Sequence, residues 1–258
     1  MKRITIGLAS LAVLLCVGGV QAATMSQGTV VRDYTDTVAP ADQQAYEAGV
    51  KAYNQCMSQH GFKYAWTAWT HETGDTYTYS YTTDPVTWAD FDTMHATGSA
   101  CDSVWQSSAN PHLKSETSAF MVMMPGMSYM PKDMGPPPAL VDVIYFTLKN
   151  GQAADEAFTN GVKMIYAAAV KTNWSGYSTT YHIVGGGPGA PDYILVIPAK
   201  NWADFGTDPN PPVWTMVANA YGKQKAQGIR NSINGAIETT SEHVDSYNAD
   251  LTFTPSGH

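Results

Sequence analysis

Histidine is the residue type in this chain that is best suited to proton transfer near neutral pH. His71 ends a predicted strand, and His95 lies two turns after Trp88 on a predicted helix. An imidazole can act as a general acid, a general base or a metal ligand. We therefore take His71 and His95 as the first candidates for catalytic residues. The alternative, that each is a hydrogen-bonded structural residue, stays open.

Aromatic side chains gather on one predicted hairpin, and Tyr77, Tyr79 and Tyr81 alternate with small polar residues along its second strand. Flat rings that line a cleft can stack on a planar ligand such as a quinone, a flavin or a porphyrin. The alternative is an apolar core between two sheets. The candidate ligand-binding residues are Trp66, Trp69, Tyr79, Trp88, Trp105, Tyr181 and His182.

Methionines are concentrated in one short segment that includes Met121, Met123, Met124 and Met127. Thioethers are soft ligands that suit copper(I). Methionine is also an adaptable apolar residue that fills strands and linkers. A copper site and a packing role are both compatible with this segment. The primary expectation is that the protein uses no cofactor, with copper and haem as the alternatives.

A repeated segment indicates how the chain positions these residues. Trp88-Ala-Asp-Phe returns as Trp202-Ala-Asp-Phe, and the segment 45–51 returns at 157–163. Both pairs are separated by about 112 to 114 residues, which is the size of a small domain. The repeated acids, Asp90 and Asp204, stand early in a helix and favour its positive end. The chain is therefore expected to contain a duplicated domain.

Each half has the pattern strand, helix, strand, strand, helix, strand. In the first half, 29–34 is a strand, 62–71 and 77–82 form a hairpin, and 118–124 is the last strand. This order is the split βαβ pattern, in which both helices cover one face of a four-stranded antiparallel sheet. The bare faces of two such sheets can cover each other. We expect an α+β fold of two tandem split βαβ domains that pack sheet to sheet as a barrel-like pseudo-dimer.

With this element order the chain resembles the dimeric α+β barrel (ferredoxin-like) superfamily. That superfamily includes antibiotic-biosynthesis-type monooxygenases, haem-degrading monooxygenases, stress-response barrel proteins and NIPSNAP-like proteins. The resemblance implies a fused pseudo-dimer that is a monomer or a higher homo-oligomer. It also implies that a haem, if present, is held by a helix histidine near a tryptophan, and Trp88 and His95 are similar to that arrangement. No catalytic signature of the family is matched.

The first residues have the character of an export signal. Lys2 and Arg3 precede an apolar stretch, and Val20-Gln-Ala22 has small residues where a signal peptidase cleaves. The expected domains are a signal peptide (1–22), a first ferredoxin-like domain (23–124), a linker rich in Pro, Gly and Met (125–138) and a second ferredoxin-like domain (139–258). The mature protein is expected in a bacterial periplasm or outside the cell, with no membrane segment.

The net charge of −8 argues against nucleic acid as a partner, because proteins that bind nucleic acid use an excess of basic residues and this chain has an excess of acidic ones. Two cysteines remain after the expected cleavage, Cys56 and Cys101. They lie on two predicted helices that cover the same sheet face, and an oxidising compartment allows them to form a disulfide. We therefore expect a Cys56–Cys101 bridge in the first half only.

These features lead to one main functional expectation and two alternatives. The main expectation is an exported barrel protein that binds a planar small molecule or has a stress-related role. The alternatives are a cofactor-independent or haem-using monooxygenase, and a protein–protein interaction module. Most candidate residues that have no equivalent in the other half belong to the first half, so the first half is expected to carry any site. Whether the protein is an enzyme stays open.

Overall fold

The computed structural model describes residues 30–130 and 137–255, whose strands form one closed antiparallel barrel. The predicted signal peptide lies outside the described residues, as does the middle of the predicted linker. The strands are β1 (Val30–Val38), β2 (Trp66–His71), β3 (Thr78–Thr83), β4 (Leu113–Met123), β5 (Leu140–Leu148), β6 (Thr179–Gly185), β7 (Tyr193–Ala199) and β8 (Ile237–Tyr247).

The two halves have the same strand order. The first half runs β4-β1-β3-β2 and the second half runs β8-β5-β7-β6. The halves meet at two junctions, where β2 pairs with β8 and β4 pairs with β6. This arrangement confirms the predicted α+β fold of two split βαβ halves joined as a barrel-like pseudo-dimer.

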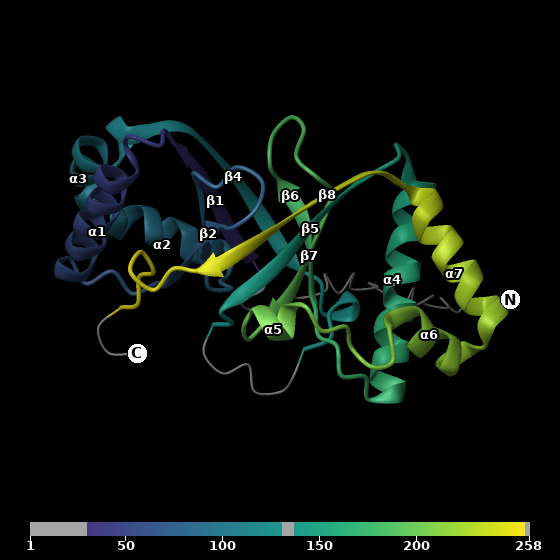
Figure 1. Ribbon diagram of the computed structural model, residues 1–258. Helices are drawn as coiled ribbons and strands as arrows, with labels where there is room; N and C mark the ends of the chain where they lie inside the picture. Colours follow the sequence, from purple (N-terminus) through teal and green to yellow (C-terminus); the bar gives the residue numbers. More distant parts are fainter. Residues whose placement is uncertain (1–29, 131–136, 256–258) are drawn as a thin grey trace, which may run out of the picture.

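Helices cover the outside of the barrel in two groups on opposite sides (Figure 1). The first half carries α1 (Gln43–Gln59), α2 (Trp88–Gly98) and α3 (Asp102–Ser108), with short 3₁₀ turns at Ser99–Cys101 and Asn110–His112. The second half carries α4 (Gln152–Thr172), α5 (Trp202–Phe205), α6 (Val213–Tyr221) and α7 (Lys223–Ala236), and a further 3₁₀ turn spans Pro125–Met127. None of the helices in the described ranges is long and apolar enough to cross a membrane.

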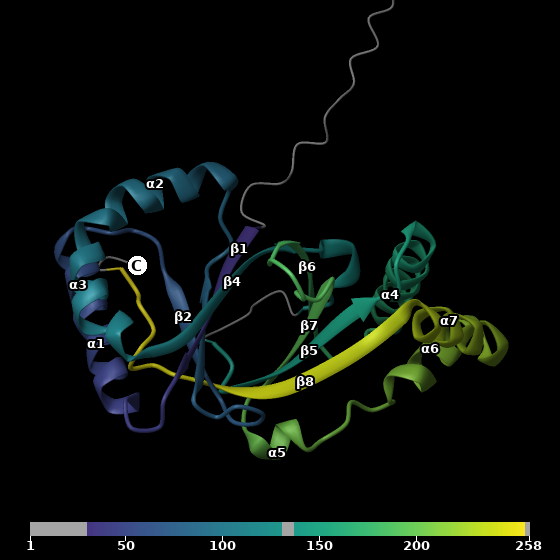
Figure 2. The ribbon, with the colours of Figure 1, turned by 90° about the horizontal axis from the view of Figure 1, so that it is seen from above.

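The second helix of each predicted half is divided into shorter helices, α2 and α3 in the first half and α5, α6 and α7 in the second. In the second half, α5 stands apart from α6 and α7 (Figure 2). The chain between α6 and α7 turns at Gly222, whose φ of +88° is open to glycine without a side-chain clash. This turn separates α6 from α7.

The repeated glycine of the two halves lies at a helix–helix contact. A Cβ atom at Gly49 of α1 would overlap the backbone of Ser108 and Ala109 at the end of α3. A Cβ atom at Gly161 of α4 would overlap the side chain of Ile233 of α7. The repeat thus preserves a close approach of two helices in each half.

The repeated Trp-Ala-Asp-Phe segments begin helices. Asp90 accepts hydrogen bonds from the backbone N–H of Thr87, at 2.8 Å, and from its hydroxyl group, at 2.6 Å. Asp204 accepts one from the backbone N–H of Lys200, at 2.9 Å. Both acids therefore cap the start of a helix, which agrees with their predicted structural role.

Candidate functional site

Two histidines and one aspartate meet at the β2–β8 junction. His71, the last residue of β2, pairs in register with Asp245 of β8. Nε2 of His71 lies 3.6 Å from Oδ1 of Asp245, and Nε2 of His243 lies 3.1 Å from the same oxygen. The two imidazole rings stack with their centroids 4.0 Å apart. We call His71, His243 and Asp245 the His–Asp cluster.

The strand register places this cluster inside the barrel. Asp245 pairs with Val141 and His243 pairs with Val143, and residues opposite each other in a sheet point to the same side. Val141 and Val143 belong to the apolar cluster in which side chains of both halves meet, together with Val31 and Ile194. The His–Asp cluster is therefore a polar site beside an apolar interior.

Burial sets the charge state of His71. Its side chain is 9% exposed and that of Asp245 is 4% exposed. Burial lowers the pKa of His71 to about 4, which outweighs the opposite effect of the neighbouring Asp245 carboxylate. Nε2 of His71 also lies 3.0 Å from the hydroxyl group of Ser80. His71 is therefore a neutral imidazole at neutral pH, available as a base or as a ligand.

Asp33 of β1 is a second acid in the barrel interior. Burial raises its pKa to about 7, a hydrogen bond from Thr35 opposes this rise, and the negative charge of Asp245 adds to it. Thr35 Oγ1 lies 3.4 Å from the Asp33 carboxylate. A carboxyl group with a pKa near the working pH can both accept and donate a proton.

Aromatic rings line the interior beside these acids. Trp69 of β2, Tyr145 of β5 and Tyr181 of β6 pack against the inner apolar cluster. Trp69 donates a hydrogen bond to Thr82 Oγ1 at 3.2 Å and contacts Tyr247 edge to face. All these rings are only partly buried although they point inward. Part of each ring is therefore accessible to solvent.

The second junction, between β4 and β6, pairs the corresponding residues in the same register but has apolar residues in the places of the His–Asp cluster. Ile183 pairs with Met121 there, as His71 pairs with Asp245 at the first junction. Ala119 of β4 takes the place of His243 of β8: Ala119 pairs with Asp33 of β1, and His243 pairs with Val143 of β5. The sequence placed any site in the first half, whereas the second half provides two of the three residues of the His–Asp cluster.

The predicted ligand-binding residues are divided between the two faces of the sheets. Trp69 and Tyr181 point into the barrel together with His71. The others point toward the helices or the surface: Trp66 and Trp105 pack beside Tyr79 in the outer core of the first half, His182 stacks on Tyr193, and Trp88 is 46% exposed. These residues do not converge on one cleft, and their predicted role in ligand binding stays a prediction.

The placement expected for His95 was wrong. The side of α2 that is turned toward the protein carries Phe91, Met94 and Gly98, whereas His95 is exposed. Met94 and Gly98, three and seven positions after Phe91, face inward, whereas His95, four positions after it, does not. His95 therefore does not reach a pocket between α2 and the sheet.

The methionines that were considered as copper ligands are not gathered in one core. Met121 lies in the inner cluster of the barrel, and its neighbour two residues on, Met123, follows it on the same strand face. Met127 is buried in the outer core of the second half, and Met124 packs against that core. The thioethers are thus divided between two cores, because β4 ends between them.

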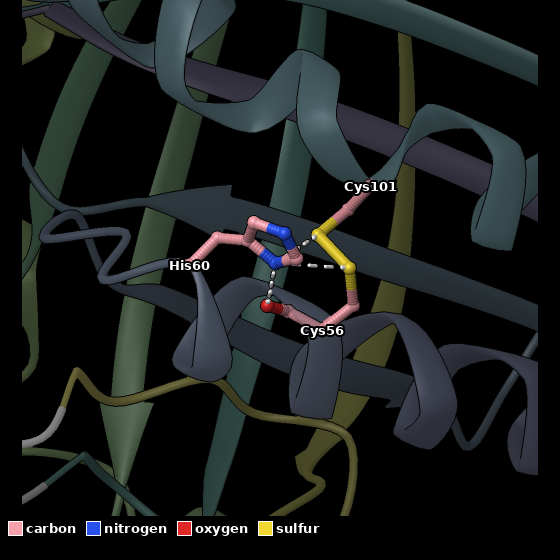
Figure 3. A group of neighbouring side chains, drawn as sticks. All are labelled: Cys56, His60 and Cys101. Carbon is pink, nitrogen blue, oxygen red and sulfur yellow. Dashed lines mark hydrogen bonds between the residues drawn. A yellow bond between two sulfur atoms is a disulfide. The ribbon is translucent and has the colours of Figure 1, made fainter.

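The predicted disulfide is confirmed. Cys56 of α1 and Cys101 of the 3₁₀ turn before α3 form a disulfide with Cα atoms 5.9 Å apart. Nδ1 of His60 lies 3.5 Å from Sγ of Cys56 and 3.7 Å from Sγ of Cys101 (Figure 3). The two sulfur atoms are bonded to each other, so this group is not a metal site in its oxidised state. The equivalent of Cys56 in the second half, Ala168, is also fully buried.

Haem does not fit the position that the resemblance implied. His95, the helix histidine, is exposed, and the space between helices and sheet in the first half is filled by Tyr46, Val50, Tyr79 and their neighbours. The corresponding space in the second half is filled by Phe158, Met216, Val217 and others. To hold a haem between helices and sheet, either half would need an axial histidine and an empty space large enough for the porphyrin.

A surface hollow of about 450 Å³ lies away from the His–Asp cluster. It is lined by the loop after β5 and the loop before β7, and it includes Lys149, Asp155 and Asp192. The hollow is open to solvent, and none of its lining residues is a histidine. We therefore base the candidate site on the inward-facing cluster, where burial and convergent polar groups coincide.

The comparisons with known proteins agree on the fold. No protein-family model and no curated protein matches the chain. A solved structure of a protein proposed to be a monooxygenase from Lactobacillus acidophilus NCFM is similar over 88% of this chain and 97% of its own, with 11% identity and a TM-score of 0.54. An anthrone oxidase-like protein is similar over 90% and 95%, with 10% identity and a TM-score of 0.54.

A mutant chlorite dismutase from Candidatus Nitrospira defluvii is similar over 87% of this chain and 94% of its own, with 13% identity and a TM-score of 0.53. Identities this low establish shared architecture and not shared activity. The chain therefore has the α+β barrel fold of monooxygenase-like and chlorite dismutase-like proteins.

Proposed function

We propose that this protein is an exported enzyme of the monooxygenase type that oxidises a planar small molecule inside the barrel. The observation that carries the proposal is the placement of Asp33 and the His–Asp cluster on the inner wall beside aromatic rings. Such a convergence of buried acids, bases and flat apolar surface is what a small-molecule site requires. The similar folds described as monooxygenase and anthrone oxidase-like support the reaction class.

Asp33 and His71 have separate roles in this proposal. Asp33, with a pKa near 7, takes a proton from an acidic C–H or O–H group of the substrate. His71 is neutral and faces the same interior, so it orients the substrate by a hydrogen bond without adding charge. Trp69 and Tyr181 provide flat apolar surface for the substrate rings.

The proposed substrate class is an anthrone-like or phenolic ring system, with dioxygen as the oxidant. Asp33 removes a proton, and the electron-rich anion that forms reacts with dioxygen. For a ring methylene group, one oxygen atom becomes the carbonyl oxygen of the product and the other leaves as water with both hydrogens. The substrate loses four electrons and dioxygen gains them, so the reaction balances.

Export is part of the proposal and has two supports. The sequence of residues 1–22 is typical of a signal peptide. The Cys56–Cys101 disulfide is of a kind that persists in oxidising compartments. Cell fractionation and N-terminal sequencing test this part, and the expected mature chain begins at Ala23.

Oxygen uptake tests the proposed activity. The purified mature protein is mixed with anthrones, hydroquinones and phenols, oxygen is followed with an electrode, and labelled dioxygen is traced into the product by mass spectrometry. Asp33→Asn is expected to lower kcat about 100-fold or more, because a general base is lost. His95→Ala is the matched control, since His95 is exposed.

Ligand binding without oxygen uptake would contradict an enzyme and favour a binding protein. Equal turnover by the Asp33→Asn variant and the unmodified protein would remove Asp33 from the mechanism. A pH profile of kcat separates a positioning effect from loss of a base, because only loss of the base removes the limb of the profile near pH 7.

A further inference from the structure

We infer that His71, His243 and Asp245 bind one divalent transition-metal ion inside the barrel. Two imidazole nitrogens and one carboxylate oxygen are a ligand set that suits iron(II), zinc(II) and similar ions. Any catalytic use of the ion rests on the function proposed above. Binding itself is independent of that function and is measured without turnover.

The distances place the three ligand atoms around a common point. Oδ1 of Asp245 lies 3.1 Å from Nε2 of His243 and 3.6 Å from Nε2 of His71, and ligand atoms of the three residues all lie within 4.8 Å of one another. Metal–ligand bonds of about 2.0–2.2 Å place neighbouring ligand atoms about 3.0–3.6 Å apart. Small side-chain rotations are sufficient to bring all three onto one ion.

One of these rotations is specific. The rings of His71 and His243 are stacked with their centroids 4.0 Å apart and their planes 20° apart, so their in-plane nitrogen lone pairs lie in two nearly parallel planes. Binding of one ion by both nitrogens requires the rings to splay. His243 has the freedom to do so, because its side chain is 13% exposed whereas that of His71 is 9% exposed and held by Ser80.

Asp245 supplies an independent observation. Its residue is only 3% exposed, and its Oδ1 atom accepts no well-directed hydrogen bond among the described residues, although Nε2 of His243 lies 3.1 Å from it and 3.2 Å from Oδ2. A buried carboxylate oxygen without a donor is costly. A cation bound by Oδ1 would remove that cost.

The second junction shows that barrel closure does not require polar groups at these positions. Ile183 and Met121 stand there in the places of His71 and Asp245, and both belong to the inner apolar cluster. Packing therefore accounts for the second junction but not for the first.

Metal titration tests the inference on the mature, disulfide-bonded protein after treatment with a chelator. Cobalt(II) is added and followed by its visible absorption bands, and zinc(II) is added in a calorimeter. The expected result is one ion per chain. Asp245→Asn and His71→Gln are each expected to weaken binding at least 100-fold, since each removes or weakens a direct ligand.

His95→Ala and His60→Ala are the controls, because His95 is exposed on α2 and His60 belongs to the disulfide group. Both are expected to bind cobalt(II) like the unmodified protein. Circular dichroism identifies a variant that fails to fold, in which case His243→Gln replaces it, since His243 is the more exposed ligand. Absence of stoichiometric binding, or binding that survives both ligand variants, would overturn the inference.

The two proposals fail separately. Stoichiometric metal binding without oxygen uptake by any substrate would leave the metal site standing and remove the monooxygenase. Oxygen uptake by a protein that binds neither cobalt(II) nor zinc(II) would leave the enzyme and remove the metal site.

Discussion

Nε2 of His71 lies 3.6 Å from Oδ1 of Asp245, and this contact joins the two halves of the chain across the β2–β8 junction. Each residue comes from a strand that also pairs within its own half. The contact therefore depends on closure of the barrel and cannot form within either half alone.

The stability of this junction can be compared with that of its apolar counterpart. Asp245→Met alone is expected to lower the free energy of unfolding by about 3 kcal/mol, because His71 and His243 lose their buried acceptor. The triple variant His71→Ile, His243→Ala, Asp245→Met copies Ile183, Ala119 and Met121 of the second junction. It is expected to recover most of that loss in urea unfolding experiments. A triple variant as unstable as the single one would contradict the equivalence of the two junctions.

The repeated glycines are expected to respond differently to alanine. Gly49→Ala should lower the free energy of unfolding by about 1–3 kcal/mol, because the new methyl group meets the backbone of Ser108 and Ala109. Gly161→Ala should be milder, because Ile233 can change its side-chain conformation and alanine favours a helix by about 1 kcal/mol. Thermal or urea unfolding of the two variants measures the difference, and equal losses would contradict this explanation.

The disulfide is expected to stabilise the first half. Its cysteines are 45 residues apart, and a loop of this size corresponds to about 2–4 kcal/mol. The variant Cys56→Ala, Cys101→Ala should unfold at lower urea concentration than the oxidised protein and should be unaffected by reductant. Alanine is chosen because Ala168 occupies the position of Cys56 in the second half. An equal free energy of unfolding with and without the disulfide would show that the disulfide does not stabilise the protein.

Asp36 gives the fold a defined pH dependence. Burial raises its pKa from 3.8 to about 7, more than the hydrogen bond from Tyr46 lowers it. The folded protein therefore holds this proton over a range in which the unfolded chain has lost it, and stability falls as pH rises from about 4 to about 7. At about 1.4 kcal/mol per pH unit, the upper limit is about 4 kcal/mol.

Asp36→Asn tests this dependence, because an amide cannot ionise. The unmodified protein should lose stability relative to the variant across that pH range, as measured by urea unfolding at successive pH values. The lowered pKa of His71 has the opposite effect between about pH 4 and its ordinary value of 6.5, but it is present in both proteins and cancels in the comparison. A difference between the proteins that stays constant with pH would disprove the assignment.

The fold could be predicted because the pattern of each half is local and occurs twice. Tyr46 and Val50 in the repeated segment 45–51 lie in the outer core, and Phe158 in the segment 157–163 lies in the equivalent core. The helix breaks at Gly222 and after Gly98 were not predicted in detail, since the position of a break depends on packing between helices.

The site was only partly predictable. His71 was identified by its residue type at a strand end, but its partners His243 and Asp245 are far away in sequence and reach it through the β2–β8 pairing. Positions 243 and 245 share one face of a strand, but the segment 237–247 is polar almost throughout, so no alternation marks that face in the sequence. His95 was misplaced because a helical stripe read from sequence does not fix which of two adjacent positions faces inward.

The paired junctions have a consequence for how this barrel can vary. In a barrel made of two identical chains, any change at one junction is copied at the other, so an acidic or imidazole side chain would be buried twice. Here both junctions belong to one chain, and the first carries His71 and Asp245 while the second carries Ile183 and Met121. Covalent fusion thus lets one junction specialise while the other keeps the barrel closed.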